Sequence, residues 1–190
     1  MKKYELKIVQ DENPESPRTS MDNPTTMICF HQRYNLGDKH NYNKNDFYLW
    51  DEIQKQIEID YKVLMILPLY LYDHSGITIS TGNFNDRWDS MRVGFVFVDE
   101  KGFEMMTDKV EDKTNEELLN RWIHDDVHLY DDYLRGEVYR YEVYEVEECS
   151  LGHEHRTLIE SCGGYYGEES CRSEGENMLK YYETEKEEVG

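Results

Sequence analysis

Histidine and aspartate side chains gather in two segments of the chain, and their chemistry is that of metal ligands. The first segment is the loop after a predicted strand at residues 26–31, and the second is the turn of a predicted hairpin. Imidazole and carboxylate groups bind zinc or another divalent ion, and neighbouring strand ends could bring the segments together. The first candidate metal site comprises His31, Asp38, His40, Asp73 and His74. In the alternative, the histidines are hydrogen-bonded structural residues and the aspartates belong to turns.

A second candidate metal site lies where cysteine and histidine are closely spaced. Thiolate and imidazole together favour a closed tetrahedral zinc site, which would hold a polar segment that has little core of its own. The residues are Cys149, His153, His155, Cys162 and Cys171. Their spacing is not that of a known zinc finger, so a loop that carries these residues without a metal is the alternative.

Sharper catalytic signatures do not occur in the sequence. It contains no Gly-rich phosphate loop, no Gly-x-Ser-x-Gly elbow and no His-Glu-x-x-His helix. Asp73, His74 and Ser75 are triad residue types, but catalytic partners normally come from separate segments. The sequence therefore favours a protein that is not an enzyme. The alternative is a metal-dependent, hydrolase-like enzyme that activates water at the first candidate site.

The charge of the chain limits its partners. Its 190 residues include 41 Asp and Glu against 21 Lys and Arg, a net charge of −20. Direct binding to nucleic acid or to an anionic membrane is excluded, because both need cations. Residues 142–190 contain fourteen glutamates and four lysines and arginines. Their charge of −10 is half of the net charge of the chain. This pattern favours a basic protein partner or mimicry of DNA, with plain solubility as the alternative.

Tyrosine is unusually frequent, with 16 residues. It is amphipathic and loses little entropy on binding, so it is enriched in protein interfaces. Alternatively, the tyrosines pack a sheet that is poor in aliphatic residues. Acidic and tyrosine side chains alternate along a predicted strand at 137–146. The candidate partner-binding residues lie on this strand and directly after it: Glu142, Glu145, Glu147, Glu148, Tyr139, Tyr141 and Tyr144.

The elements that would position these residues are read from hydrophobic spacing. A nearly continuous apolar run at 63–71, followed by a turn and the alternating residues 77–80, predicts a central hairpin over about 63–81, its first strand buried on both faces. Principal helices are predicted at about 46–60, capped by Asp46, and about 114–135, with a Thr114–Glu117 capping box. Further strands are predicted near 4–8, 26–31, 93–97, 137–146 and 157–162.

The fold class is therefore α+β with a mainly antiparallel sheet. The length predicts a single domain over 1–190, with a flexible arm at about 10–25 and an acidic tail at about 183–190. Four cysteines and a start without a secretory signal predict a cytoplasmic protein with reduced thiols.

Several stretches of the chain resemble a set of small bacteriophage and prophage proteins, some of them labelled antirestriction. The resemblance covers Asp22 to Gly167 and rests on CFHQRYNLGDKHNY, LPLYLYDHSGITIST, the WDS and VGFVFV stretch, YDDYLRGEVYRYEV and SCGGYYG. It implies a phage-encoded protein that acts against host defence in the bacterial cytoplasm. Acidity and size are also similar to those of anti-CRISPR proteins that block type II (Cas9) effectors. The partner expected from this resemblance is a CRISPR effector nuclease or a restriction enzyme, and an accessory structural phage protein is a further alternative.

Overall fold

The structure is a computed structural model that describes residues 3–84, 86, 88–107 and 115–185. The chain, treated as one domain from its length, divides into two compact units. Ser16–Arg135 forms one, here called the inserted unit. Met1–Glu15 and Gly136–Gly190 together form the other, here called the flanking unit. Each unit is described by itself.

The inserted unit is built on an antiparallel four-stranded sheet with the order β2-β5-β3-β4. Its strands are β2 (Thr26–Cys29), β3 (Val63–Asp73), β4 (Ile77–Ser80) and β5 (Ser90–Asp99). The predicted hairpin is confirmed, because β3 and β4 pair across the turn from Asp73 to Ile77. The expectation that its first strand is buried on both faces is wrong. β3 is mostly half-buried, whereas β5, which lies between β2 and β3, is buried along most of its length.

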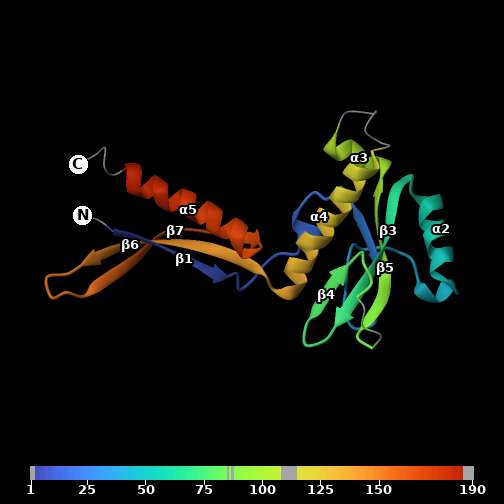
Figure 1. Cartoon of the computed structure of the whole chain (residues 1–190), viewed down its shortest axis with the longest axis horizontal. Helices are drawn as coiled ribbons and strands as arrows, with labels where there is room; N and C mark the ends of the chain where they lie inside the picture. Colours follow the sequence, from blue (N-terminus) through green and yellow to red (C-terminus); the bar gives the residue numbers. More distant parts are fainter. Residues whose placement is uncertain (1–2, 85, 87, 108–114, 186–190) are drawn as a thin grey trace. The chain divides into compact units, whose positions relative to one another are not determined.

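Two helices cover the opposite faces of this sheet, as Figure 1 shows: α2 (Trp50–Asp60) and α4 (Glu116–Arg135). Ile53 and Ile57 of α2 pack with Phe95 and Phe97 of β5. On the other face, α4 contributes a second cluster that includes residues such as Leu119, Ile123, Val127 and Tyr130. The antiparallel α+β class predicted from the sequence is confirmed.

Gly94 sets how closely β2 and β5 can approach. The register between β3 and β5 shifts at Leu69/Tyr70, where Leu69 pairs with Gly94 and Tyr70 with Arg92. A Cβ atom at position 94 would lie 1.9 Å from the carbonyl oxygen of Ile28. Only glycine permits this approach without a shift of the backbone.

The predicted helix starts need correction. The segment at Asp46 forms a 3-10 turn, η1 (Lys44–Asp46), in which Asn43 is the capping residue. α2 begins four residues later, where the Glu52 carboxylate accepts hydrogen bonds from the backbone N–H groups of Tyr48 and Leu49. Asp46 is therefore not its cap.

The predicted cap of the second principal helix, Thr114, lies outside the described residues. Asn115 is described, and its side-chain Oδ1 accepts a hydrogen bond from the backbone N–H of Leu118. This contact is a capping interaction at the start of α4. The structure also contains two short helices that were not predicted, α1 (Pro17–Ser20) and α3 (Glu100–Met106).

The flanking unit is an antiparallel three-stranded sheet with one helix. Its strands are β1 (Lys3–Gln10), β6 (Val138–Glu148) and β7 (Glu154–Tyr166), in the order β1-β6-β7. Helix α5 (Glu168–Glu185) lies along one face of this sheet (Figure 1). A Cβ atom at Gly175 would come within 2.8 Å of Leu6 and 3.0 Å of Tyr141, so glycine at this position lets the helix approach the sheet closely.

The ends of the flanking unit also differ from the prediction. The segment predicted as an acidic tail begins inside α5, which continues to Glu185, and residues 186–190 lie outside the described part. The segment predicted as an arm at 10–25 contains the short helix α1.

Among the described residues, no helix combines the length and apolar character that crossing a membrane requires.

Candidate functional site

The candidate partner-binding residues of β6 divide between the two faces of its sheet, because successive side chains of a strand point to opposite sides. Tyr141 is buried with Val143 and Cys171 in the cluster under α5, and Tyr139 packs against that cluster. Glu142 and Tyr144 therefore lie on the face away from α5. The two tyrosines at 139 and 141 contribute to the core, as the packing alternative for tyrosine proposed.

Glu142 is the centre of a polar network within the flanking unit. One carboxylate oxygen accepts a hydrogen bond of 2.7 Å from the Tyr144 hydroxyl, and the other lies 3.0 Å from Nη2 of Arg140. Lys7 lies 4.9 Å from the centre of the Tyr144 ring. The bond to Glu142 raises the pKa of the Tyr144 phenol. With 9% of its surface exposed, Glu142 is engaged inside the protein rather than presented to a partner.

β6 and β7 form a second hairpin, and its exposed acidic residues lie around the turn between the two strands. Glu147 and Glu148 at the end of β6 and Glu154 at the start of β7 are exposed, and Glu145 is half-buried. Glu154 lies 2.9 Å from Arg156 and 3.9 Å from Lys3. The turn is closed by a hydrogen bond from the Cys149 N–H to the His153 carbonyl oxygen.

A larger set of exposed acids lies on α5. Its apolar side, with Cys171, Met178, Leu179 and Tyr182, packs on the sheet. Among the described side chains of α5, the exposed cations are Arg172 and Lys180, and Arg172 pairs with Glu168. We call the exposed acids of α5 and of the hairpin turn the acidic surface: Glu147, Glu148, Glu154, Glu168, Glu169, Glu174, Glu176 and Glu183.

Asp38, from the first candidate metal site, belongs to a buried ion-pair network. The Arg18 side chain is 3% exposed and donates to both carboxylate oxygens of Asp38, at 3.0 and 2.6 Å. Nη1 of Arg18 lies 3.5 Å from Asp126, which also accepts a 2.7 Å hydrogen bond from Thr25. Burial raises the pKa of the Asp126 carboxyl. The network ties helix α1 and the loop after β2 to α4, and Arg18 engages both carboxylate oxygens of Asp38.

The other four residues of the first candidate metal site each have their own contacts. His31 accepts hydrogen bonds from the backbone N–H groups of residues 33 and 34, and His40 Nε2 lies 2.9 Å from the Cys29 carbonyl oxygen. Asp73 pairs with Arg33, and His74 Nδ1 lies 3.0 Å from Asp89. Across the described ranges, no three or more His, Cys, Asp or Glu side chains form a group that could hold a metal ion.

The second candidate metal site is spread over three elements. Cys149 and His153 lie in the hairpin turn, and His155 and the exposed Cys162 lie on β7. Cys171 is fully buried on α5. The described structure therefore leaves this set unassembled, and zinc stays a prediction for both sets.

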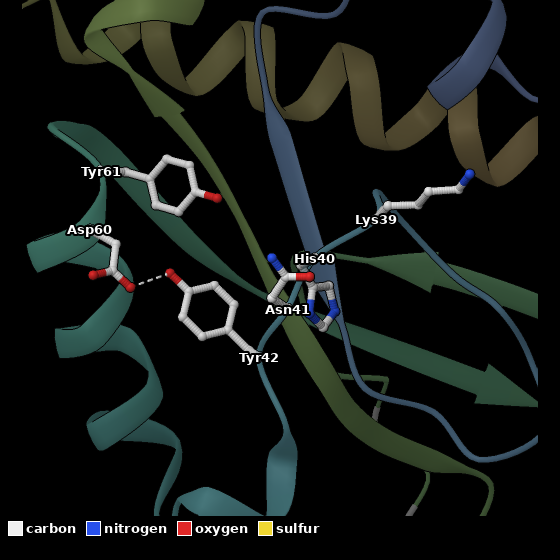
Figure 2. Close-up of a pocket in the computed structure, with 6 residues that line it drawn as sticks. All are labelled: Lys39, His40, Asn41, Tyr42, Asp60 and Tyr61. Carbon is white, nitrogen blue, oxygen red and sulfur yellow. Dashed lines mark hydrogen bonds between the residues drawn. The ribbon is translucent and has the colours of Figure 1, made fainter.

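A pocket of about 570 Å³ lies in the inserted unit, beside the C-terminal end of α2 (Figure 2). The Tyr42 hydroxyl donates a 2.6 Å hydrogen bond to Asp60, whose second oxygen accepts one of 2.9 Å from Gln56. Burial, followed by this bond to Asp60, raises the pKa of the Tyr42 phenol, so the phenol stays protonated at neutral pH. The lining residues are Lys39, His40, Asn41, Tyr42, Asp60 and Tyr61.

Comparisons with known proteins do not assign a family. Neither the protein families, nor the curated proteins, nor the solved structures contain a match to this chain. The resemblance to phage proteins therefore stays a prediction.

Sequence reasoning found His40 but missed the rest of the pocket. Tyr42 lies in the loop after β2, whereas Asp60 and Tyr61 end a helix, so their contact comes from tertiary packing. Arg18 was missed as well. Its one signal in the sequence was an isolated cation in a proline-rich, acidic segment of a strongly acidic chain.

Proposed function

We propose that this chain is a non-enzymatic inhibitor that binds a basic, nucleic-acid-binding surface of a bacterial defence nuclease in a fixed stoichiometry. Its sharpest form is a phage-encoded anti-CRISPR protein that acts on Cas9 in the bacterial cytoplasm. The observation that carries the proposal is the acidic surface of the flanking unit. The resemblance of the sequence to phage proteins supplies the class of target.

The charge balance of α5 supports binding to a basic partner. This helix carries five exposed glutamates and only two exposed cations among its described side chains, Arg172 and Lys180. Within the described residues, Glu169, Glu174, Glu176 and Glu183 form no ion pair. Each exposed charge contributes little to affinity alone, but a field of one sign accelerates association with a surface of the opposite sign. The effect weakens as salt screens the charges.

The environments of the candidate catalytic residues also favour binding over catalysis. Asp38 and Asp73 are paired with arginines, and His40 is hydrogen-bonded to a backbone carbonyl. An enzyme that activates water on a metal needs several ligands directed at one point. The described residues of this set do not converge in that way.

The proposal can be tested with Cas9 loaded with a guide RNA. The variant replaces four glutamates of α5 by glutamine: Glu169→Gln, Glu174→Gln, Glu176→Gln and Glu183→Gln. A matched control makes the same change of charge on exposed acids of the inserted unit: Asp51→Asn, Glu116→Gln, Glu117→Gln and Asp125→Asn. We expect the α5 variant to associate about tenfold more slowly at low salt, and the control to be much less affected.

Three results would contradict the proposal or its sharpest form. Equal slowing by both variants would mean that total charge matters and that α5 is not the binding surface. Inactivation of many Cas9 molecules by one copy of the protein would indicate catalysis. Uninhibited cleavage of target DNA at a several-fold molar excess of the protein would exclude the anti-CRISPR form of the proposal.

A further inference from the structure

The C-terminal end of α2 carries the wrong charge for a helix end. The carbonyl groups there give it a partial negative charge, which lysine, arginine or histidine normally balances. The last turn of α2 contains no basic residue. It contains Glu58 and Asp60 instead, and Asp60 lines the pocket of Figure 2. A cation bound in this pocket would relieve the unfavourable charge.

Aromatic rings border the carboxylate in the pocket. Figure 2 shows Tyr42 and Tyr61 beside Asp60, while the amine of Lys39 points away from all three. The Tyr42 proton is donated to Asp60, which leaves lone pairs on the phenol oxygen free to accept from a ligand. The faces of tyrosine rings attract cations. Tyr61 is held in place by Phe97, with ring centres 5.0 Å apart.

The imidazole of His40 forms part of the pocket wall. Its Nε2 faces the Cys29 carbonyl oxygen at 2.9 Å, and because a carbonyl only accepts, Nε2 carries the proton. In the neutral ring, the lone pair is then on Nδ1. That nitrogen is shielded and takes no hydrogen bond from the described residues.

We propose that this pocket binds a guanidinium group. A guanidinium is planar, stacks on aromatic faces, is weakly hydrated, and carries several N–H donors for the oxygens of Asp60 and Tyr42. An ammonium group lacks the flat face, and a metal ion would find a single carboxylate among the lining residues. The inference is independent of the acidic surface, because the pocket lies within the inserted unit. The group is presented either by a small free compound or by an arginine of a polypeptide.

Direct titration of the full-length protein tests this inference. Ethylguanidinium is added while the ring signals of Tyr42 and Tyr61 are followed by NMR. We expect saturable shifts of both rings. Ethylammonium, which has the same charge without the planar face, should bind several-fold more weakly, and urea, planar but uncharged, should not bind. A blocked Gly-Arg-Gly peptide distinguishes the source: binding at least as tight as that of ethylguanidinium identifies a polypeptide arginine, and weaker or no binding a free compound.

Two variants and a control locate the site. Asp60→Asn keeps an acceptor for Tyr42 but removes the charge, so ethylguanidinium affinity should fall by about fivefold, the scale of an exposed ion pair. Asp51→Asn makes the same change in the first turn of the same helix, and affinity should be unchanged. Tyr42→Leu removes the ring face and the phenol oxygen that the ligand would contact, so affinity should fall at least as much as in Asp60→Asn.

The proposal fails if ethylguanidinium gives no saturable shifts, or if ethylammonium or urea matches it. It also fails if Asp51→Asn lowers the affinity as much as Asp60→Asn, or if Tyr42→Leu leaves it unchanged. Because wild-type protein and small molecules are sufficient for the first comparison, a poorly folded variant does not remove the test.

Discussion

Arg18 has a larger structural role than any other cation described here. Its guanidinium is buried between Asp38 and Asp126, and its Nη2 also donates a 2.7 Å hydrogen bond to the Thr25 carbonyl oxygen. Asp38 in turn accepts a 2.7 Å hydrogen bond from the backbone N–H of Met27, the second residue of β2. One side chain thus connects α1, β2, the following loop and α4.

Removal of Arg18 should destabilise the inserted unit strongly. In Arg18→Ala, two carboxylates would remain partly buried without their cation, a change that costs about 3–5 kcal/mol of unfolding free energy. Arg33→Ala is the control, because Arg33 pairs with Asp73 while 68% of its own side chain is exposed, and such pairs contribute about 1 kcal/mol or less. Urea unfolding followed by tryptophan fluorescence measures both, since Trp50, Trp88 and Trp122 all lie in this unit. Equal losses of unfolding free energy in Arg18→Ala and Arg33→Ala would show that the Arg18 network is not buried.

The candidate site could be predicted from the sequence in its residue types but not in its geometry. The alternation along residues 137–146 predicts a strand with two different faces, and the structure has this strand at Val138–Glu148. It does not tell which face a helix will cover, so Tyr141 and Glu142 were placed together as binding residues. Likewise, the carboxylate of Asp38 is chemically suited to bind a metal. The sequence does not show that Arg18, twenty residues earlier, pairs with it in the fold.

At the level of elements, the helices and strands that have a clear hydrophobic period could be predicted from the sequence. The apolar spacing along α4, the alternation of β1, β4 and β6, and the apolar run of β3 were sufficient for these elements to be identified. Helix α5 is not among the principal helices predicted from the sequence, because its apolar side is narrow and includes Cys171 and Gly175. Its stability as a helix comes from packing on β1 and β6 rather than from its own sequence. Asp46 resembles a helix cap in the sequence because it precedes a helical apolar period. In the structure Asn43 caps the 3-10 turn η1, and Glu52 accepts a hydrogen bond from the backbone at the start of α2.

The contact between β2 and β5 gives a sharp test at this scale. Gly94→Ala would place a methyl carbon 1.9 Å from the Ile28 carbonyl oxygen, and relief requires the two strands to separate. We expect a loss of stability of several kcal/mol, roughly the upper range for point substitutions. Gly82→Ala is the control, because its nearest contact would be the Ser80 hydroxyl at 3.7 Å. Thermal unfolding of both variants measures the difference, and similar melting temperatures would refute the predicted close approach.

At the level of the whole molecule, the two compact units should be separable. The inserted unit has hydrophobic clusters on both faces of its sheet, made of its own residues. We expect a fragment of residues 16–135 to fold alone, with dispersed NMR signals and a cooperative unfolding transition. A matched fragment of residues 136–190 lacks β1 and should not form the three-stranded sheet. Collapse of the 16–135 fragment into an unstructured chain would show that this unit depends on the rest of the protein.

The pairing of β1 with β6 also fixes an order of events during synthesis. Lys3 is the partner of Val146, and Gln10 is the partner of Tyr139. When β1 leaves the ribosome, its partner strand has not yet been translated. Residues 16–135 can complete their own sheet during this interval, whereas β1 must remain unpaired until the strand at 138–148 emerges. β1 is therefore translated before the strands of the inserted unit but paired after them, and in the meantime a nascent chain presents an unpaired β1 to chaperones and proteases.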